Sequence, residues 1–127
     1  LNDYCDKLNL LNTYDYILIE GAGGICSPLS SDGLNIEFAK KVKMDSILIA
    51  RDEIGVINNV ILSINAFIKY KLNLKAIVLN RINTKQPSGM DNAKELRSFT
   101  NIPIIQIIKG RPTERAVKKL LNLALLR

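Results

Sequence analysis

A carboxylate followed at once by a glycine-rich turn is the most informative chemical feature of this sequence. Glu20 closes a run of apolar residues and precedes the segment Gly21-Ala22-Gly23-Gly24. A carboxylate at the end of a buried run must be paired, hydrogen-bonded or bound to a cation. Glycines let the backbone approach a ligand closely and offer N–H donors to phosphate or carboxylate oxygens. The pattern indicates a metal and phosphate site, and the alternative is a tight turn whose amides satisfy Glu20.

Polar residues also follow two later apolar runs. Arg51 and Asp52 come after the second run, and Asn80 and Arg81 come after the third. The Asn80 amide has both a donor and an acceptor with which to meet a purine edge. An Asn that leads into a turn is equally expected on conformational grounds, so both interpretations of Asn80 stay open.

Gly55 opens a long amphipathic segment, and Asn58 lies in its first turn. If this segment is a helix, its free N-terminus carries a partial positive charge that favours an anionic group. An Asn in the first turn of a helix is also a common cap or a solvated residue. Asn58 is therefore a candidate ligand for an anion with an ordinary structural alternative.

Composition excludes several classes of function. The 127-residue chain has no His, which excludes Ser-His and Cys-His nucleophile pairs, His metal sites and imidazole bases. Its net charge of +6 comes from scattered Lys and Arg, and no aromatic residues interleave with a basic stripe, so we expect no nucleic-acid partner. Cys5 and Cys26 show neither metal-ligand nor disulfide spacing. This cysteine pattern favours a reducing, cytoplasmic setting. No apolar stretch reaches the roughly 20 residues of a membrane span, so we expect no membrane partner.

The elements that must position these residues alternate along the chain. Apolar runs predict strands at residues 16–19, 46–50, 76–79 and 103–108. Helical periodicity predicts helices at residues 2–11, 34–42, 55–71, 90–99 and 113–125. Alternating helices and strands, with strands that lack polar alternation, indicate an α/β fold. We predict one domain, residues 1–127, with a doubly wound, mostly parallel sheet covered by helices on both faces.

This fold predicts where the candidate residues meet. Ligands of open parallel sheets bind beyond the carboxyl ends of the strands. Glu20, Asp52 and Asn80 each lie at such an end, so we expect them along one edge of the sheet. Two long loops, at residues 21–33 and 81–89, follow predicted strands and are candidates for function because of their length.

Four segments resemble the dethiobiotin synthetase family. Residues 14–24, YDYILIEGAGG, and the Pro28-Leu29 pair that follows resemble its Y-D-x-x-x-x-E-G-A-G-G and P-L pattern. Residues 47–51 and 54–58 resemble its strand, loop and G-[TC]-I-N helix start, and residues 76–82 resemble its next strand and base-binding turn. Asn122-Leu123-Ala124-Leu125-Leu126 is similar to the closing segment of some members. The resemblance spans nearly the whole chain, in order and with compatible spacing, and implies a P-loop NTPase-like fold.

The resemblance implies roles in binding ATP and Mg²⁺. Glu20 would be a magnesium ligand and a catalytic residue. The backbone of Gly21, Ala22 and Gly23 would border ATP and the reacting diamine. Asn80 and Arg81 would contact adenine, beside a segment that carries Lys109 and Gly110.

The resemblance also implies the reaction and its partners. A carbamate would form from 7,8-diaminononanoate and CO2, take the γ-phosphoryl group of ATP, and close to the ureido ring of dethiobiotin in biotin biosynthesis. Positioning and charge neutralisation carry such phosphoryl chemistry, so a chain without His is compatible with it. The carboxylate tail of the diamine would lie across a homodimer interface, held by Gly24, Gly55, Val56 and Asn58.

The sequence departs from the family in three places. No G-x-x-x-x-G-K-[ST] phosphate loop occurs, and in the family that loop lies upstream of the residues matched here. The N-terminal part of the fold is therefore expected to be missing from this chain, which should be inactive alone. Lys109 replaces a Pro that borders the base in many members, and Val56 replaces a Thr or Cys but keeps the backbone N–H.

Two other functions remain open. A cobyrinic acid diamide synthetase-like amidotransferase also carries a strand-Glu-Gly segment, although the G-V-I-N helix start of residues 55–58 favours dethiobiotin synthetase. A non-catalytic nucleotide-binding or regulatory module that lost its phosphate loop is the second alternative. The coding sequence upstream of Leu1 would discriminate them, because a phosphate loop there supports the enzyme.

Overall fold

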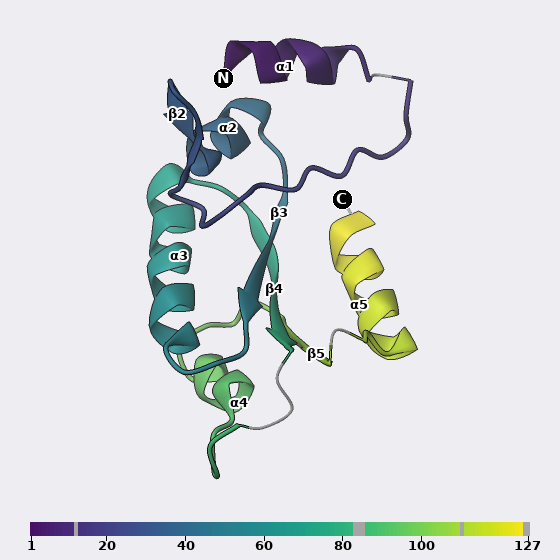
Figure 1. Cartoon of the computed structure of the whole chain (residues 1–127). Coiled ribbons are helices and arrows are strands. Elements are labelled where there is room, and N and C mark those ends of the chain that lie inside the picture. The colour runs from purple at the N-terminus through teal and green to yellow at the C-terminus, as the bar shows by residue number, and fades with distance from the viewer. Residues whose placement is uncertain (12, 83–85, 110, 126–127) are drawn as a thin grey trace.

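The computed structural model describes residues 1–11, 13–82, 86–109 and 111–125. Helices and strands alternate from α2 onward, as predicted for an α/β fold (Figure 1). The elements are α1 (Asn2–Asn9), β1 (Pro28–Ser30), β2 (Gly33–Leu34), α2 (Asn35–Val42), β3 (Ser46–Arg51), α3 (Val56–Tyr70), β4 (Leu74–Arg81), α4 (Asn92–Arg97), β5 (Ile104–Ile108) and α5 (Glu114–Leu125). The five predicted helices are confirmed, with ends that differ from the prediction by a few residues.

Strands β3, β4 and β5 form a parallel sheet in that order, which confirms the predicted parallel arrangement. Central strand β4 is buried on both faces, because Ala76, Ile77, Val78 and Leu79 are each at most 2% exposed. Its continuous apolar sequence matches this double burial. The parallel register brings the carboxyl ends of β3 and β4 side by side, with Arg51 opposite Asn80.

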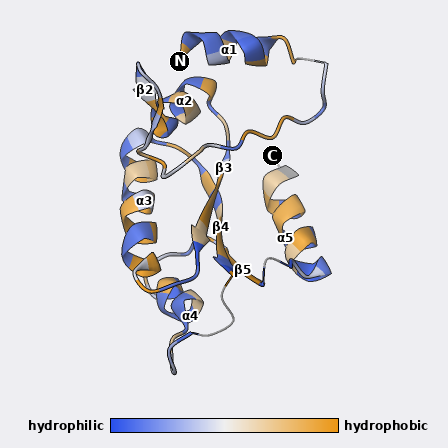
Figure 2. Ribbon diagram, in the orientation of Figure 1, coloured by the Kyte–Doolittle hydropathy of each residue, from blue (hydrophilic) through white to orange (hydrophobic). Residues whose placement is uncertain are grey.

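Helices cover both faces of the sheet. Helices α3 and α4 lie on one face and α5 on the other (Figure 1). The apolar stripe of α3 buries Val60 and Phe67 against the α3-facing side of β4, and α4 adds Leu96. Burying a side chain of this size contributes about 1.5–3 kcal/mol, so this contact stabilises the fold. The hydropathy colouring shows hydrophobic residues along β3, β4 and β5 and on much of α5, whereas α3 carries both hydrophobic and hydrophilic residues (Figure 2).

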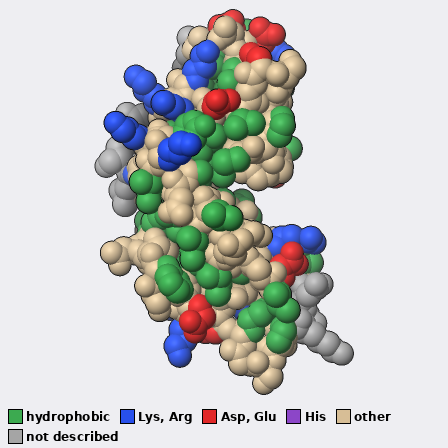
Figure 3. All heavy atoms as spheres, turned by 90° about the vertical axis from the view of Figure 1, so that its left-hand side faces the viewer, with side chains coloured by type: hydrophobic (Ala, Val, Ile, Leu, Met, Phe, Trp, Pro, Cys, Tyr) green, Lys and Arg blue, Asp and Glu red, His purple; other side chains and the backbone are tan. Residues whose placement is uncertain are grey.

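Helix α3 has a clear start and a clear end. Gly55 precedes it with φ of +91°, a conformation that side-chain-bearing residues rarely adopt. Lys71 ends it in the left-handed region, and its N–H donates to the Ile68 carbonyl. The outer side of this helix also carries apolar residues, since Leu62 is 60% and Ile68 is 68% exposed (Figure 3).

The predicted strand at residues 16–19 is wrong for this structure, which has no strand there. Tyr16 is 70% exposed and Leu18 is 96% exposed. A strand needs a neighbour for its N–H and C=O groups and a surface on which to bury its side chains. Within the described part of the chain, the parallel sheet forms from β3, β4 and β5 without this segment, so most of its apolar side chains remain exposed.

The predicted loop at residues 21–33 contains a short hairpin that the sequence did not reveal. Strands β1 and β2 pair in antiparallel orientation. β1 has three residues and β2 has two, so neither strand is long enough for an alternation of apolar and polar residues to be recognised in the sequence. In the second predicted loop, residues 83–85 lie outside the described residues. Nowhere in the described ranges does a helix have the length and apolar character for a membrane crossing.

Candidate functional site

The carboxyl ends of β3 and β4 form a polar edge, as the sequence predicted for Arg51, Asp52, Asn80 and Arg81. A small hollow of about 20 Å³ lies there, lined by residues that include Arg51, Asp52 and Asn80. The strand ladder continues past β3, since the Asp52 N–H donates to the Asn80 carbonyl at 2.9 Å. We call this region, residues 51–53 and 80–82, the strand-end site.

Asp52 is the centre of the strand-end site. Its side chain is fully buried and accepts from the Arg81 guanidinium, with Nε at 3.0 Å and Nη2 at 2.9 Å from Oδ2. The Asn92 amide donates to its other oxygen at 2.7 Å. The Gln86 amide donates to the Asp52 backbone carbonyl at 3.0 Å. The Asp52 carboxylate thus ties the end of β4 to the start of α4, and the Asp52 backbone carbonyl holds the following loop.

These contacts determine the charge of Asp52. Burial acts to raise the pKa of its carboxyl, because an ionised group loses hydration in the protein. Hydrogen bonds from the side chains of Asn92, Arg81 and Gln86, together with the charge of Arg81, outweigh burial and lower the pKa below 3.8. Asp52 is therefore an anion at neutral pH and forms a buried ion pair with Arg81.

Two buried acceptors in the described residues have no hydrogen-bond partner: Asn80 Oδ1 and Gln86 Oε1. A buried acceptor without a donor costs about 1–3 kcal/mol, so such groups are uncommon in folded proteins. Both belong to residues bonded to the Asp52 backbone. The strand-end site therefore has acceptor capacity for a ligand that carries N–H groups.

The start of α3 follows directly from the strand-end site. Gly55 is exposed and nothing lies within 4 Å of a Cβ built on it. Val56 is buried, and its N–H donates to the Glu53 carbonyl at 3.2 Å. Asn58 is exposed, with its amide 3.4 Å from Asn59 Oδ1. Gly55 and Asn58 are thus accessible to a ligand, whereas the Val56 N–H already has a partner.

The glycine segment lies against the start of α2. The buried Asn35 amide donates to the carbonyls of Ala22 at 2.8 Å and Gly24 at 3.1 Å. A Cβ on Gly21 would lie 2.9 Å from Asn35 Oδ1, so this close approach requires glycine. Gly23 has φ of +76°, and the Gly24 N–H donates to Ser27 Oγ at 2.9 Å. Asn35 therefore holds the turn in place.

Glu20 does not reach the strand-end site in this structure, which corrects the expectation that it shares an edge with Asn80. It is exposed and follows the segment that forms no strand. Figure 1 shows the glycine segment near α2, toward the end of the sheet where β3 begins, and the carboxyl ends of β3 and β4 at the other end. Among the described residues, no three His, Cys, Asp or Glu side chains cluster as a metal site.

Lys109 is placed near the strand-end site by its backbone. Its N–H donates to the Arg81 carbonyl at 2.6 Å, and its φ is +58°. Its exposed side chain follows β5 directly. Gly110, the other residue predicted to border the base, lies outside the described residues.

Sequence reasoning missed three residues that bond to the strand-end site or to the glycine segment: Gln86, Asn92 and Asn35. Gln86 and Asn92 come from the loop and helix after β4, and Asn35 from α2. No spacing rule links them to the strands they contact. The one available signal was Asp52, a charged residue directly after a buried strand, which requires polar partners from elsewhere in the fold.

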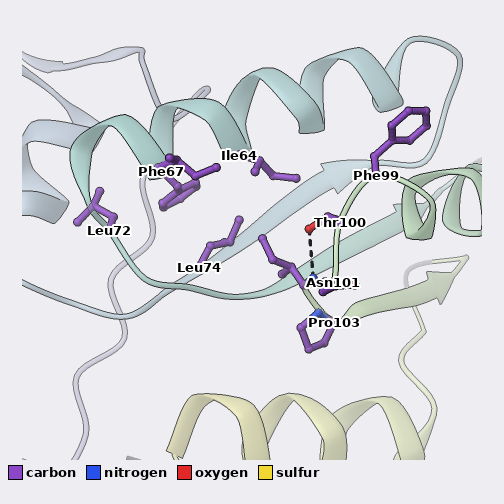
Figure 4. A pocket seen from close by; sticks show the side chains of 10 residues that line it. Ile64, Phe67, Leu72, Leu74, Phe99, Thr100, Asn101 and Pro103 are labelled. Atoms are coloured by element: carbon purple, nitrogen blue, oxygen red, sulfur yellow. Dashed lines mark hydrogen bonds between the residues drawn. The ribbon is translucent and has the colours of Figure 1, made fainter.

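A larger, apolar groove lies at the opposite end of the sheet, where β4 and β5 begin. It has a volume of about 620 Å³. It is lined by the second half of α3, the start of β4 and the segment before β5, with residues that include Ile64, Phe67, Leu74, Phe99 and Pro103 (Figure 4). It contains none of the site residues predicted from the sequence.

Comparison with known proteins gives the family. Residues 1–115 match the model of a family described as an AAA domain. The chain is 35% identical over 109 residues to the ATP-dependent dethiobiotin synthetase of Vesicomyosocius okutanii, covering 84% of this chain and 49% of that protein. It is 33% identical over 118 residues to the enzyme of the same name from Ruthia magnifica, which covers 91% of this chain and 54% of that protein.

A third relative has a similar identity. The dethiobiotin synthetase of Clostridium botulinum strain Loch Maree is 33% identical over 115 residues, which covers 84% of this chain and 51% of that protein. The chain thus spans about half the length of the curated relatives it matches. These matches show that the chain, with its parallel α/β sheet, belongs to the AAA domain family and is a distant relative of the ATP-dependent dethiobiotin synthetases.

Proposed function

We propose that the protein containing this chain closes the ureido ring of dethiobiotin from 7,8-diaminononanoate, CO2 and ATP. The observation that carries the proposal is the match to ATP-dependent dethiobiotin synthetases over 84% and 91% of the chain. The motifs quoted above lie within it in the family's order. Because the chain spans about half the length of these relatives, the proposal concerns the whole protein.

The strand-end site supports adenine binding. Asn80 Oδ1 is buried without a partner, and the exocyclic amine of adenine supplies the N–H donor that it lacks. The Arg81 side chain is 21% exposed, so a ligand would meet it while Asp52 holds its guanidinium. Lys109, bonded through its N–H to the Arg81 carbonyl, and Gly110 would border the base on the β5 side.

Glu20 is the residue that we propose as the metal ligand and catalytic carboxylate. Mg²⁺ in nucleotide sites is held by one or two carboxylates together with phosphates and waters, so a single carboxylate fits part of such a site. A bound Mg²⁺ would neutralise phosphate charge during transfer. Glu20 can approach the strand-end site if residues 16–19 enter the sheet as a strand, since parallel strands end at one edge.

The remaining site residues have binding and orienting roles. The backbone of Gly21, Ala22 and Gly23 would border the phosphates and the diamine, with Asn35 holding their turn. Gly24, Gly55, Val56 and Asn58 would hold the carboxylate tail of the diamine, with the α3 N-terminus as the favourable electrostatic partner. Holding two reacting groups in position supplies much of the rate in such reactions. We propose that a second copy of the protein completes this tail site as a homodimer.

Replacement of Glu20 tests the proposed site. In the protein at its full encoded length, Glu20→Gln keeps the shape and removes the charge, so the rate of dethiobiotin formation should fall at least about 100-fold. The exposed Glu95 on α4 provides the matched control, and Glu95→Gln should keep the wild-type rate. Formation of ADP and dethiobiotin, followed at several Mg²⁺ concentrations, measures the effect. A Glu20→Gln enzyme with the wild-type rate would remove Glu20 from the site.

A further inference from the structure

We propose that Asp52 is a positioning residue for nucleotide binding, which holds Arg81 in the orientation that meets the base. This inference rests on the proposed function, in that it takes the strand-end site to be the place where adenine binds. It assigns a role to a residue that contacts no nucleotide itself.

The geometry at Asp52 goes beyond a simple surface ion pair. Its carboxylate has no exposed surface, and two guanidinium nitrogens of Arg81 lie 3.0 and 2.9 Å from the same oxygen, Oδ2. The guanidinium is planar and rigid, so contacts through two of its nitrogens fix its direction as well as its place. Surface ion pairs such as Lys118 with Glu114 lack this burial, since both side chains are more than 70% exposed.

Asp52 controls the backbone of the same segment. Its own N–H donates to the Asn80 carbonyl at 2.9 Å, one residue before Arg81. Asp52 therefore fixes the strand end through its backbone and the guanidinium through its carboxylate. One residue thus contacts both the backbone of Asn80 and the side chain of Arg81.

Asn92 fixes the carboxylate in turn. Its buried amide donates to Asp52 Oδ1 at 2.7 Å, which leaves Oδ2 for Arg81. With each oxygen committed to a different donor, the carboxylate cannot rotate without losing a bond. Arg81 consequently has one preferred direction before any ligand arrives, and preorganisation of this kind improves affinity.

The test uses the protein at its full encoded length and Asp52→Asn, which keeps the size of the side chain and removes its charge. A fluorescent N-methylanthraniloyl derivative of ATP reports nucleotide binding, and steady-state rates give KM for ATP and for the diamine. We expect Asp52→Asn to weaken ATP binding and raise KM for ATP about tenfold, with kcat and KM for the diamine within about twofold of wild type.

Asp45 provides a matched control. It also pairs with a cation and an amide, Lys75 at 3.3 Å and Asn73 at 2.6 Å, but it lies at the opposite end of β3. Asp45→Asn should leave KM for ATP unchanged. In an Arg81→Met background, Asp52→Asn should weaken ATP binding no further, because its effect passes through Arg81.

The outcomes separate this inference from the proposed function. Equal loss of affinity for ATP and diamine, or unchanged ATP binding in Asp52→Asn, overturns the positioning role even if dethiobiotin is formed. A wild-type protein that binds ATP but forms no dethiobiotin overturns the function, and the ATP titration still decides the role of Asp52. A wild-type protein that binds no ATP overturns both. If Asp52→Asn does not fold, Arg81→Lys, which keeps the charge and loses the planar fork, must show the same selective loss of ATP binding or the inference fails.

Discussion

At the scale of single residues, Asp52 shows how a buried charge constrains its surroundings. A carboxylate without exposed surface is tolerated because Arg81 supplies the opposite charge and Asn92 a further donor. Removing the acceptor leaves a buried amide and a partly buried guanidinium without their partner. The same contacts that orient Arg81 therefore also stabilise the fold.

Asp52→Ala should lower the free energy of unfolding by about 3 kcal/mol at neutral pH. The folded-state pKa of Asp52 is lowered from 3.8, so its contribution is complete above that pH and is lost as pH falls through the lower, folded-state value. The difference between wild type and variant should thus stay constant from neutral pH to about pH 5 and shrink below pH 3.8. Urea unfolding of wild type and variant at several pH values measures this difference in the free energy of unfolding.

Asp45→Ala is the control for this measurement. The Asp45 side chain is 47% exposed in its pair with Lys75, so its loss should cost less than about 1 kcal/mol. A difference for Asp52→Ala that is as small as this, or that grows on acidification, would contradict the buried ion pair.

The sequence predicted part of this network. Arg51, Asp52, Asn80 and Arg81 could be placed together because parallel strands end at one edge, and the register confirms it. The contact of Asn92 with Asp52 could not be predicted, because it joins side chains forty residues apart whose meeting depends on how α4 packs. The roles of these residues in binding stay predictions.

At the scale of elements, the apolar run at residues 16–19 shows the limit of sequence patterns. Its composition is that of a buried strand, as in β4, yet Leu18 is 96% exposed. A pattern indicates what a segment can form, and strand formation also requires a neighbouring strand. Helix α3 was predicted well because its backbone hydrogen bonds are internal and its apolar stripe finds β4.

Amide hydrogen exchange tests the state of this segment. In the isolated chain, amides at residues 16–19 should exchange within seconds at neutral pH, whereas those of Ile77, Val78 and Leu79 should be strongly protected. In the full-length protein, protection of residues 16–19 should rise toward that of β4, since we propose that they become a strand there. Protection of the segment in the isolated chain, or none in the full-length protein, would contradict this view.

At the scale of the whole molecule, the strand-end site, which we propose faces the base, occurs in a sequence without a phosphate-binding loop motif. The sequence has no G-x-x-x-x-G-K-[ST] motif, and the chain spans about half the length of its curated relatives. In phosphoryl transfer, catalysis comes mostly from positioning and neutralising the phosphates. Adenine contacts alone supply neither, so we expect the 127-residue chain to be inactive by itself.

The most direct measurement is dethiobiotin formation from isotope-labelled CO2. The full-length protein, given 7,8-diaminononanoate, ATP, Mg²⁺ and labelled bicarbonate, should release ADP and form dethiobiotin that carries the label in its ureido carbonyl, as seen by mass spectrometry. The isolated chain under the same conditions should form none. Absence of labelled dethiobiotin from the full-length protein, with ATP bound, would contradict the proposed function.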